Sequence, residues 1–177
     1  AYYIIKKKHL EIAKPSFKIA LIIATFFSFA QLATGHKSAD GVAKNQPAKL
    51  AALEGHYDSS AAADMYLFGW VDNKSEEVKG IKIPGGLSFL LHQNFNTPVT
   101  GLHAFKPNER PTQINAIFQV YHIMIAIGMF LIGLTAYASW LLFKGKLFEK
   151  KWLLHIFAWS VFLPQIANQA GWFAAEM

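Results

Sequence analysis

Residues Ile117–Phe143 read IFQVYHIMIAIGMFLIGLTAYASWLLF and carry no charge when histidine is counted as neutral. A helix needs about 20 apolar residues to cross roughly 30 Å of hydrocarbon, and this run exceeds that length. A second uncharged run, Trp152–Ala175, meets the same criterion. A third apolar run, Phe17–Leu32, lies at the lower limit of length and contains one charge, Lys18, whose ammonium group can extend toward water. Buried helices of a large soluble protein are the alternative, but runs of this length favour membrane spans.

These runs predict an all-α membrane protein, a transmembrane helix bundle with one long extracytoplasmic loop. Both chain ends look cut, so we expect an internal segment of a longer polypeptide. The predicted segments are a truncated span at 1–5, a basic loop at 6–16, a span at 17–33, the long loop at 34–115, a span at 116–143, a basic loop at 144–151 and a span at 152–177.

The composition agrees with a membrane chain that carries excess positive charge. Hydrophobic residues make up 53% of the 177 residues and aromatic residues 15%, and 17 Lys and Arg stand against 11 Asp and Glu. The mean hydropathy is +0.24. Cysteine is absent, which excludes disulfides and thiolate metal sites within this segment.

The positions of the charges predict the topology. Both short loops are basic, whereas the long loop holds equal numbers of basic and acidic residues. The positive-inside rule places the short loops in the cytoplasm, so the long loop and the C-terminal end lie outside. Nucleic acid is not an expected partner, because no basic and aromatic groove pattern accompanies the charge.

The long loop contains pieces of predicted order. Asn45–Gly55 reads as a short helix, with Pro47 in its first turn and Gly55 as its stop. Phe68–Val71 and Val78–Ile83 read as strands that flank a polar turn.

Lys49 and Glu54 are the candidate ligand-binding pair on this loop helix. They are five positions apart, so they lie roughly 140° apart around the helix axis. Beside Leu50 and Leu53, a cation and a carboxylate could receive an apolar ligand with polar ends, such as a quinol, and Glu54 could accept its proton. Residue chemistry alone favours the alternative, two solvated charges on an amphipathic helix.

The span at 116–143 holds Met124 and His122. A thioether can ligate heme iron, although a methionine in a membrane helix is usually a packing residue. His122 lies roughly 200° around the helix from Met124, so the two cannot serve the same face. An ionisable residue within a span suggests a functional site, but an interfacial histidine with satisfied hydrogen bonds is the favoured alternative.

The span at 152–177 carries polar residues toward its outer end. Pro164 lacks a backbone N–H and is expected to kink the helix. Trp172 and Glu176 are four apart and share a face. The carboxylate of Glu176 either ends the span or ligates iron or relays protons, and the residues alone leave these alternatives open.

Taken in order, these motifs resemble subunit I of the cytochrome bd-type quinol oxidases over essentially the whole chain. The loop helix is similar to the start of the family's quinol-binding Q-loop, and the later motifs are similar to the two helices that follow it. The matching motifs are Asn45-Gln-Pro-Ala-Lys49-Leu-Ala-Ala-Leu-Glu54-Gly, Tyr121-His-Ile-Met124-Ile-Ala-Ile-Gly, Glu149-Lys-Lys-Trp152-Leu-Leu, Leu163-Pro164 and Gly171-Trp172-Phe-Ala-Ala-Glu176.

The resemblance implies a quinol:oxygen oxidoreductase that passes electrons through hemes to dioxygen, giving water and a proton-motive force. The implied cofactors are a low-spin heme b, a high-spin heme b, and heme d or a further heme b. The implied roles are Lys49 and Glu54 at the quinol, Met124 as iron ligand of the low-spin heme b, Glu176 as iron ligand of the high-spin heme b, Trp172 beside the hemes, and His122 at the cofactor where many members carry arginine.

The resemblance also implies a multi-pass protein of the bacterial cytoplasmic (inner) membrane with the Q-loop outside. Its expected partners are membrane lipid, ubiquinol or menaquinol, and a second large membrane subunit. The segment alone is not expected to be active, because the family's heme histidines and proton-path acids belong to other helices. A heme-free membrane transporter segment and a membrane anchor with a partner-binding outer loop are the competing interpretations.

Overall fold

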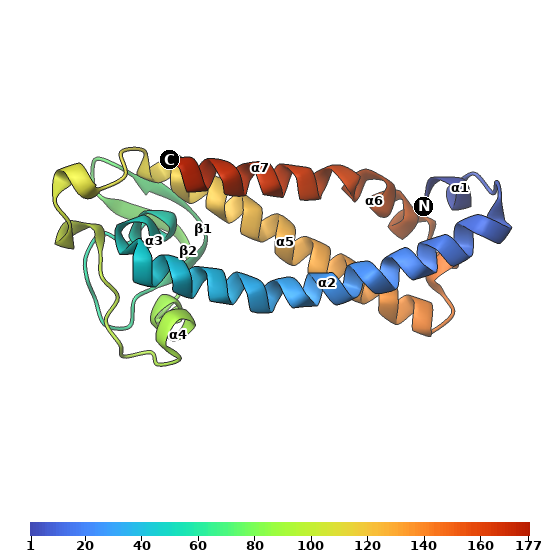
Figure 1. The fold of residues 1–177 in the computed structure, drawn as a ribbon, viewed down its shortest axis with the longest axis horizontal. Helices are drawn as coiled ribbons and strands as arrows, with labels where there is room; N and C mark the ends of the chain where they lie inside the picture. Colours follow the sequence, from blue (N-terminus) through green and yellow to red (C-terminus); the bar gives the residue numbers. More distant parts are fainter. The chain divides into compact units, whose positions relative to one another are not determined.

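The computed structural model describes residues 1–177 and is mostly helical (Figure 1). Short 3-10 turns (η) connect several of the α-helices. In chain order the elements are α1 (Tyr2–Ile5), α2 (Leu10–Asn45), α3 (Pro47–Glu54), β1 (Met65–Asp72), β2 (Glu77–Ile83), α4 (Gly86–His92), η1 (Leu102–Ala104), η2 (Pro107–Glu109), α5 (Ile114–Phe143), η3 (Leu147–Glu149), α6 (Lys151–Trp159), η4 (Ser160–Phe162) and α7 (Leu163–Glu176).

The chain divides into two compact units, which are described separately. The helical unit comprises Ala1–Thr34 and Ile125–Asn168, and the loop unit comprises Gly35–Met124 and Gln169–Met177. Helices α2, α5 and α7 each contribute residues to both units.

Two segments, Leu10–Asn45 and Pro107–Phe143, are long and apolar enough to cross a membrane. Only 6% and 22% of their most apolar windows are buried within the structure. Helix α2 is longer than the expected span at 17–33, because an apolar run marks only the part of a helix that suits hydrocarbon. The remaining residues at both ends include charged side chains, such as Glu11 and Lys44, but continue the helix.

The expected span at 152–177 is not one continuous helix. Helix α6 ends at Trp159, the turn η4 follows, and α7 begins at Leu163. Pro164 has no N–H to donate to the carbonyl group of Ser160, so the α-helical ladder cannot run through this position. The expected kink is therefore present, in the form of a break between two shorter helices.

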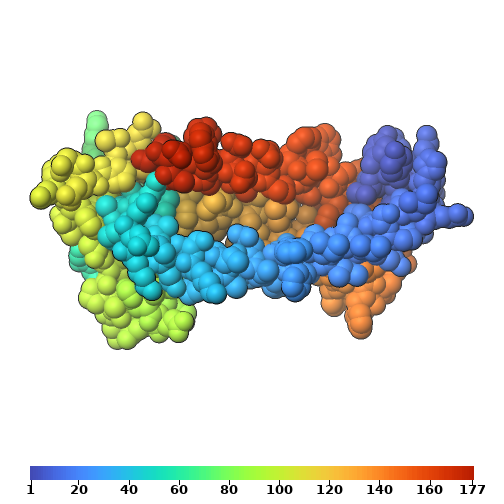
Figure 2. Space-filling model, in the orientation of Figure 1, coloured from blue at the N-terminus to red at the C-terminus, as the bar shows by residue number.

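The helical unit has its own apolar core, to which α2, α5 and α6 contribute. A polar contact joins two of these helices, since the hydroxyl groups of Thr25 and Ser139 are 2.7 Å apart. Figure 2 shows α2, in blue, at the surface of the structure. Many of its apolar side chains are exposed there, including Ile22, Phe26 and Phe27, as expected for a helix that faces lipid. The buried core residues are Leu21, Leu134, Ala138, Leu141, Leu147 and Leu153.

The loop unit contains the antiparallel hairpin β1–β2, so the fold is mostly helical rather than all-α. The register pairs Gly69 with Gly80, and an irregularity lies between Tyr66 and Phe68. The strands extend the two that the sequence predicts by a few residues. Figure 1 shows the hairpin, α3 and the start of α5 together in this unit.

The core of the loop unit joins α3 and the hairpin to α5. Phe118 and Ile117 of α5 are fully buried and form its centre. Partly buried side chains, including Tyr66 and Tyr121, pack around it. The buried members are Ala51, Ala52, Leu53, Val71, Leu102, Ile114, Ile117, Phe118 and Ala174.

Candidate functional site

Helix α3 forms where the sequence predicts it and places Glu54 at its last turn. Pro47 occupies the first turn, and Gly55 ends the helix in the left-handed conformation with φ 62°. A Cβ at Gly55 would lie 2.6 Å from Cγ2 of Val78 and 3.3 Å from the ring of Phe118. The glycine thus allows the end of α3 to pack directly on the hairpin and α5.

The Glu54 side chain is buried in this packing, with 3% of its surface exposed. Its Oε2 atom has no hydrogen-bond partner. A buried carboxyl oxygen without a hydrogen-bond partner destabilises the fold. Its presence therefore suggests that the carboxyl group binds a ligand or exchanges protons.

Burial raises the pKa of Glu54 from 4.5 to about 7, and a hydrogen bond from the Tyr121 hydroxyl opposes part of this increase. A carboxyl group with a pKa near neutrality can exchange protons at physiological pH, which suits a general base. Sequence reasoning did not single out Tyr121 as a partner of Glu54, because a tyrosine near the end of a membrane helix is ordinary.

Lys49 lies on another side of α3 and is half-buried. Its Nζ donates a hydrogen bond to the backbone carbonyl of Ala175 in α7. The structure thus brings Lys49 to the end of α7, next in sequence to Glu176. Lys49 and Glu54 share α3, as predicted, but contact different neighbours.

His122 is buried, and both of its ring nitrogens face backbone carbonyl oxygens. Nδ1 lies 2.8 Å from the oxygen of Phe118, and Nε2 lies 2.9 Å from the oxygen of Tyr66. The imidazole also stacks on the Phe118 ring, with 3.9 Å between ring centroids. These contacts hold β1 against α5. A neutral imidazole has one N–H, so it donates to one of the two carbonyl groups. Both nitrogens face backbone oxygens, so neither is free to bind iron in this structure.

Met124 lies two residues further along α5 and is half-buried. Its thioether faces Gly171 of α7, where an added Cβ would lie 2.8 Å from Sδ. Sequence spacing alone could not predict this pairing, because it depends on how two separate helices pack.

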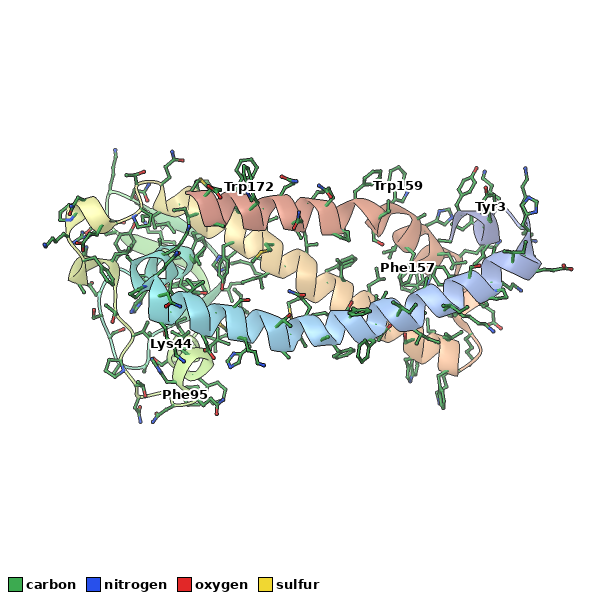
Figure 3. All side chains as sticks on the ribbon, viewed as in Figure 1. Tyr3, Lys44, Phe95, Phe157, Trp159 and Trp172 are labelled. Atoms are coloured by element: carbon green, nitrogen blue, oxygen red, sulfur yellow. The ribbon has the colours of Figure 1, made fainter.

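Helix α7 has two distinct faces in the loop unit. Ala170 and Ala174 are buried, with 8% and 5% exposed. Trp172 and Glu176 are exposed and lie one turn apart. Figure 3 shows the Trp172 ring directed away from the helix. The exposed face therefore presents an indole and a carboxylate together, as the spacing predicts.

The loop unit also holds a polar cleft that the sequence did not reveal. It has a volume of about 470 Å³, and its lining includes Asp58 and Glu76. The His103 ring lies between these two carboxylates, with Nδ1 2.8 Å from Asp58 and Nε2 2.9 Å from Glu76. The three residues are far apart in the sequence, so no local pattern could have identified them.

The donors for an iron cofactor are single residues rather than a cluster. No group of three or more His, Cys, Asp or Glu residues could hold a metal ion. Met124 is half-buried with its thioether against Gly171, and the carboxylate of Glu176 is exposed. A thioether is a known ligand of heme iron, so Met124 and Glu176 would fit a heme better than a free metal ion, which needs several clustered donors.

Comparisons with known proteins agree on one family. Residues 1–177 match the family model described as cytochrome bd terminal oxidase subunit I. The chain is 30% identical over 187 residues to cytochrome bd ubiquinol oxidase subunit 1 of Bacillus subtilis, covering 100% of this chain and 40% of that protein. It is 24% identical over 242 residues to cytochrome bd-II ubiquinol oxidase subunit 1 of Escherichia coli, covering 99% of this chain and 47% of that protein.

A solved structure gives the same result. The bd oxidase from Geobacillus thermodenitrificans matches with a TM-score of 0.88 and 32% identity, over 99% of this chain and 40% of that one. The chain thus spans less than half the length of the relatives it matches.

Proposed function

Because the chain belongs to the cytochrome bd terminal oxidase subunit I family over its full length, we propose that it forms the quinol-oxidising and heme-binding part of that subunit. The observation that best supports this proposal is the buried Glu54 carboxyl group, whose Oε2 atom has no hydrogen-bond partner and whose pKa is about 7. The match to an oxidase family leaves the transporter and anchor interpretations without a supporting observation.

Glu54 acts as the proton acceptor for quinol in this proposal. Oxidation of a quinol releases protons from its hydroxyl groups, and a base near neutral pKa can take one of them. Tyr121 holds the carboxyl group in place through its hydroxyl. Lys49, half-buried on the same helix, orients the ring oxygen with its ammonium group.

Met124 and Glu176 are the proposed iron ligands, with Trp172 beside the cofactor. Heme, when bound, would supply one-electron redox chemistry, and a methionine ligand would favour a higher reduction potential. His122 contributes to this region by joining β1 to the helix that carries Met124. The heme types, two hemes b with heme d or a further heme b, are part of the proposal.

The setting of the proposed reaction is the bacterial cytoplasmic membrane. The long loop lies on the outer side, so protons released from quinol leave on that side. The substrate is ubiquinol or menaquinol, the electron acceptor is dioxygen, and the partner is a second large membrane subunit.

The test is Glu54→Ala in the full-length subunit within its complex. We expect quinol oxidation to be lost while the heme content, measured from optical spectra, stays unchanged. Glu77→Ala is the matched control, because Glu77 is an exposed carboxylate in the same loop. Retained turnover in Glu54→Ala, or loss of heme, would contradict the proposed role.

A further inference from the structure

Gly171 of α7 lies directly against the side chain of Met124. A Cβ added at Gly171 would lie 2.8 Å from Sδ and 3.9 Å from Cγ of Met124. Apart from Gly171's own helix backbone and its chain neighbours, nothing else lies within 4 Å of that position. The thioether of Met124 therefore occupies the space that a side chain at position 171 would fill.

The other glycines of the long helices behave differently. An added Cβ would meet nothing within 4 Å at Gly35 and Gly41 of α2, or at Gly128 and Gly133 of α5. Among the glycines of α2, α5 and α7, only Gly171 has a neighbouring side chain so close that an added Cβ would clash with it.

Backbone conformation does not explain the glycine at this position. Gly171 is not among the glycines with positive φ, which are Gly55, Gly85 and Gly145. Alanine forms helices better than glycine, so helix stability alone would favour alanine here. What glycine provides is space beside the sulfur.

We propose that Gly171 is a positioning residue that fixes where the Met124 thioether lies. This inference rests on the proposed function, in which that thioether ligates the low-spin heme b. A larger residue at this position would push the sulfur away from its place, because Sδ is the atom nearest to the added Cβ. The reduction potential depends on the axial ligand, so a displaced sulfur changes it.

The clash at Gly171 is one that the fold can relieve. Met124 is unbranched with three rotatable bonds, and Sδ lies near its flexible end. Rotation of this side chain makes room for a methyl group without moving either helix. Gly171→Ala should therefore fold and bind heme, with the sulfur displaced.

The experiment compares variants of the full-length subunit within the membrane complex. The measurements are the reduced-minus-oxidised spectrum and the midpoint potential of the low-spin heme b. For Gly171→Ala we expect normal heme content and a lowered midpoint potential. At a fixed ambient potential, the ratio of reduced to oxidised low-spin heme b should be severalfold smaller than in the unmodified protein. Gly171→Leu should have a larger effect. The control Gly35→Ala, at a site with open space, should leave the potential unchanged.

Met124→Leu separates the two proposals. If it removes the low-spin signature while Gly171→Ala matches the control, Met124 is a ligand and the role of Gly171 is refuted. If Met124→Leu leaves the signature intact, the ligand assignment itself is wrong and the inference about Gly171 falls with it. Loss of the signature in Met124→Leu together with a lowered potential in Gly171→Ala supports both.

Discussion

Quinol oxidation should depend on pH through the Glu54 carboxyl group. Its pKa, raised from 4.5 to about 7 by burial, means that the group is mostly protonated below pH 7 and becomes a base above it. Since only the ionised form accepts a proton, kcat/KM for quinol should rise roughly tenfold between pH 6 and the plateau above about pH 8. Steady-state kinetics in the full-length complex would measure this profile.

The pH profile of a control variant and one contrary result test the role of Glu54. Glu77→Ala should show the same dependence as the unmodified protein, because Glu77 is exposed. A flat profile between pH 5 and pH 8 in the unmodified protein would show that another group accepts the proton.

At this scale the sequence named candidate residues but did not predict their surroundings. Residue chemistry favoured solvated charges for Lys49 and Glu54, yet Glu54 is 3% exposed. Its burial depends on α5 and the hairpin, which are distant in the sequence. The same holds for Met124, whose neighbour Gly171 comes from another helix. Tertiary packing sets these environments, and a single sequence does not encode them in any local pattern.

Elements with strong local signals were predicted most closely. Helix α3 begins at Pro47 and ends before Gly55, as proline and glycine positions indicate. The break ahead of α7 also follows from a local cause, Pro164. The sequence did not predict how far α2 extends beyond its apolar part. Hydropathy indicates which part of a helix suits hydrocarbon, not where the helix begins and ends.

The hairpin β1–β2 should be sensitive to substitution at Gly80. An added Cβ there would clash with the backbone oxygen of Phe68 and lie 2.5 Å from Cα of Gly69. Backbone atoms cannot rotate away, so Gly80→Ala should force the strands apart and cost about 1–3 kcal/mol. Hydrogen exchange in residues 65–83 of the full-length subunit should become faster.

Gly41→Ala is the control for this substitution, since nothing lies within 4 Å of its added Cβ. Equal exchange in the two variants would mean that the hairpin accommodates the methyl group, and that the close pairing of Gly69 with Gly80 is not required.

At the scale of the whole molecule, the distribution of charge predicts which loops face which side. The positive-inside rule predicts that the basic loops lie in the cytoplasm, so the hairpin turn is expected outside. In a full-length subunit without other cysteines, a membrane-impermeant maleimide should label Ser75→Cys when applied from outside. Lys146→Cys, in the basic loop before α6, should react only after the membrane is opened. The reverse pattern of labelling would invert the proposed topology.

The contacts of His103 with Asp58 and Glu76 join three separate segments of the loop through hydrogen bonds. The chain has no cysteine, so no covalent bond ties these segments together. Hydrogen bonding to Asp58 and Glu76 raises the pKa of His103 above 6.5, so the bridge is complete at low pH and weakens as pH rises through the raised value. A reductant would leave this tie untouched, whereas an alkaline solution would loosen it. The tie between these loop segments therefore responds to pH and not to redox state.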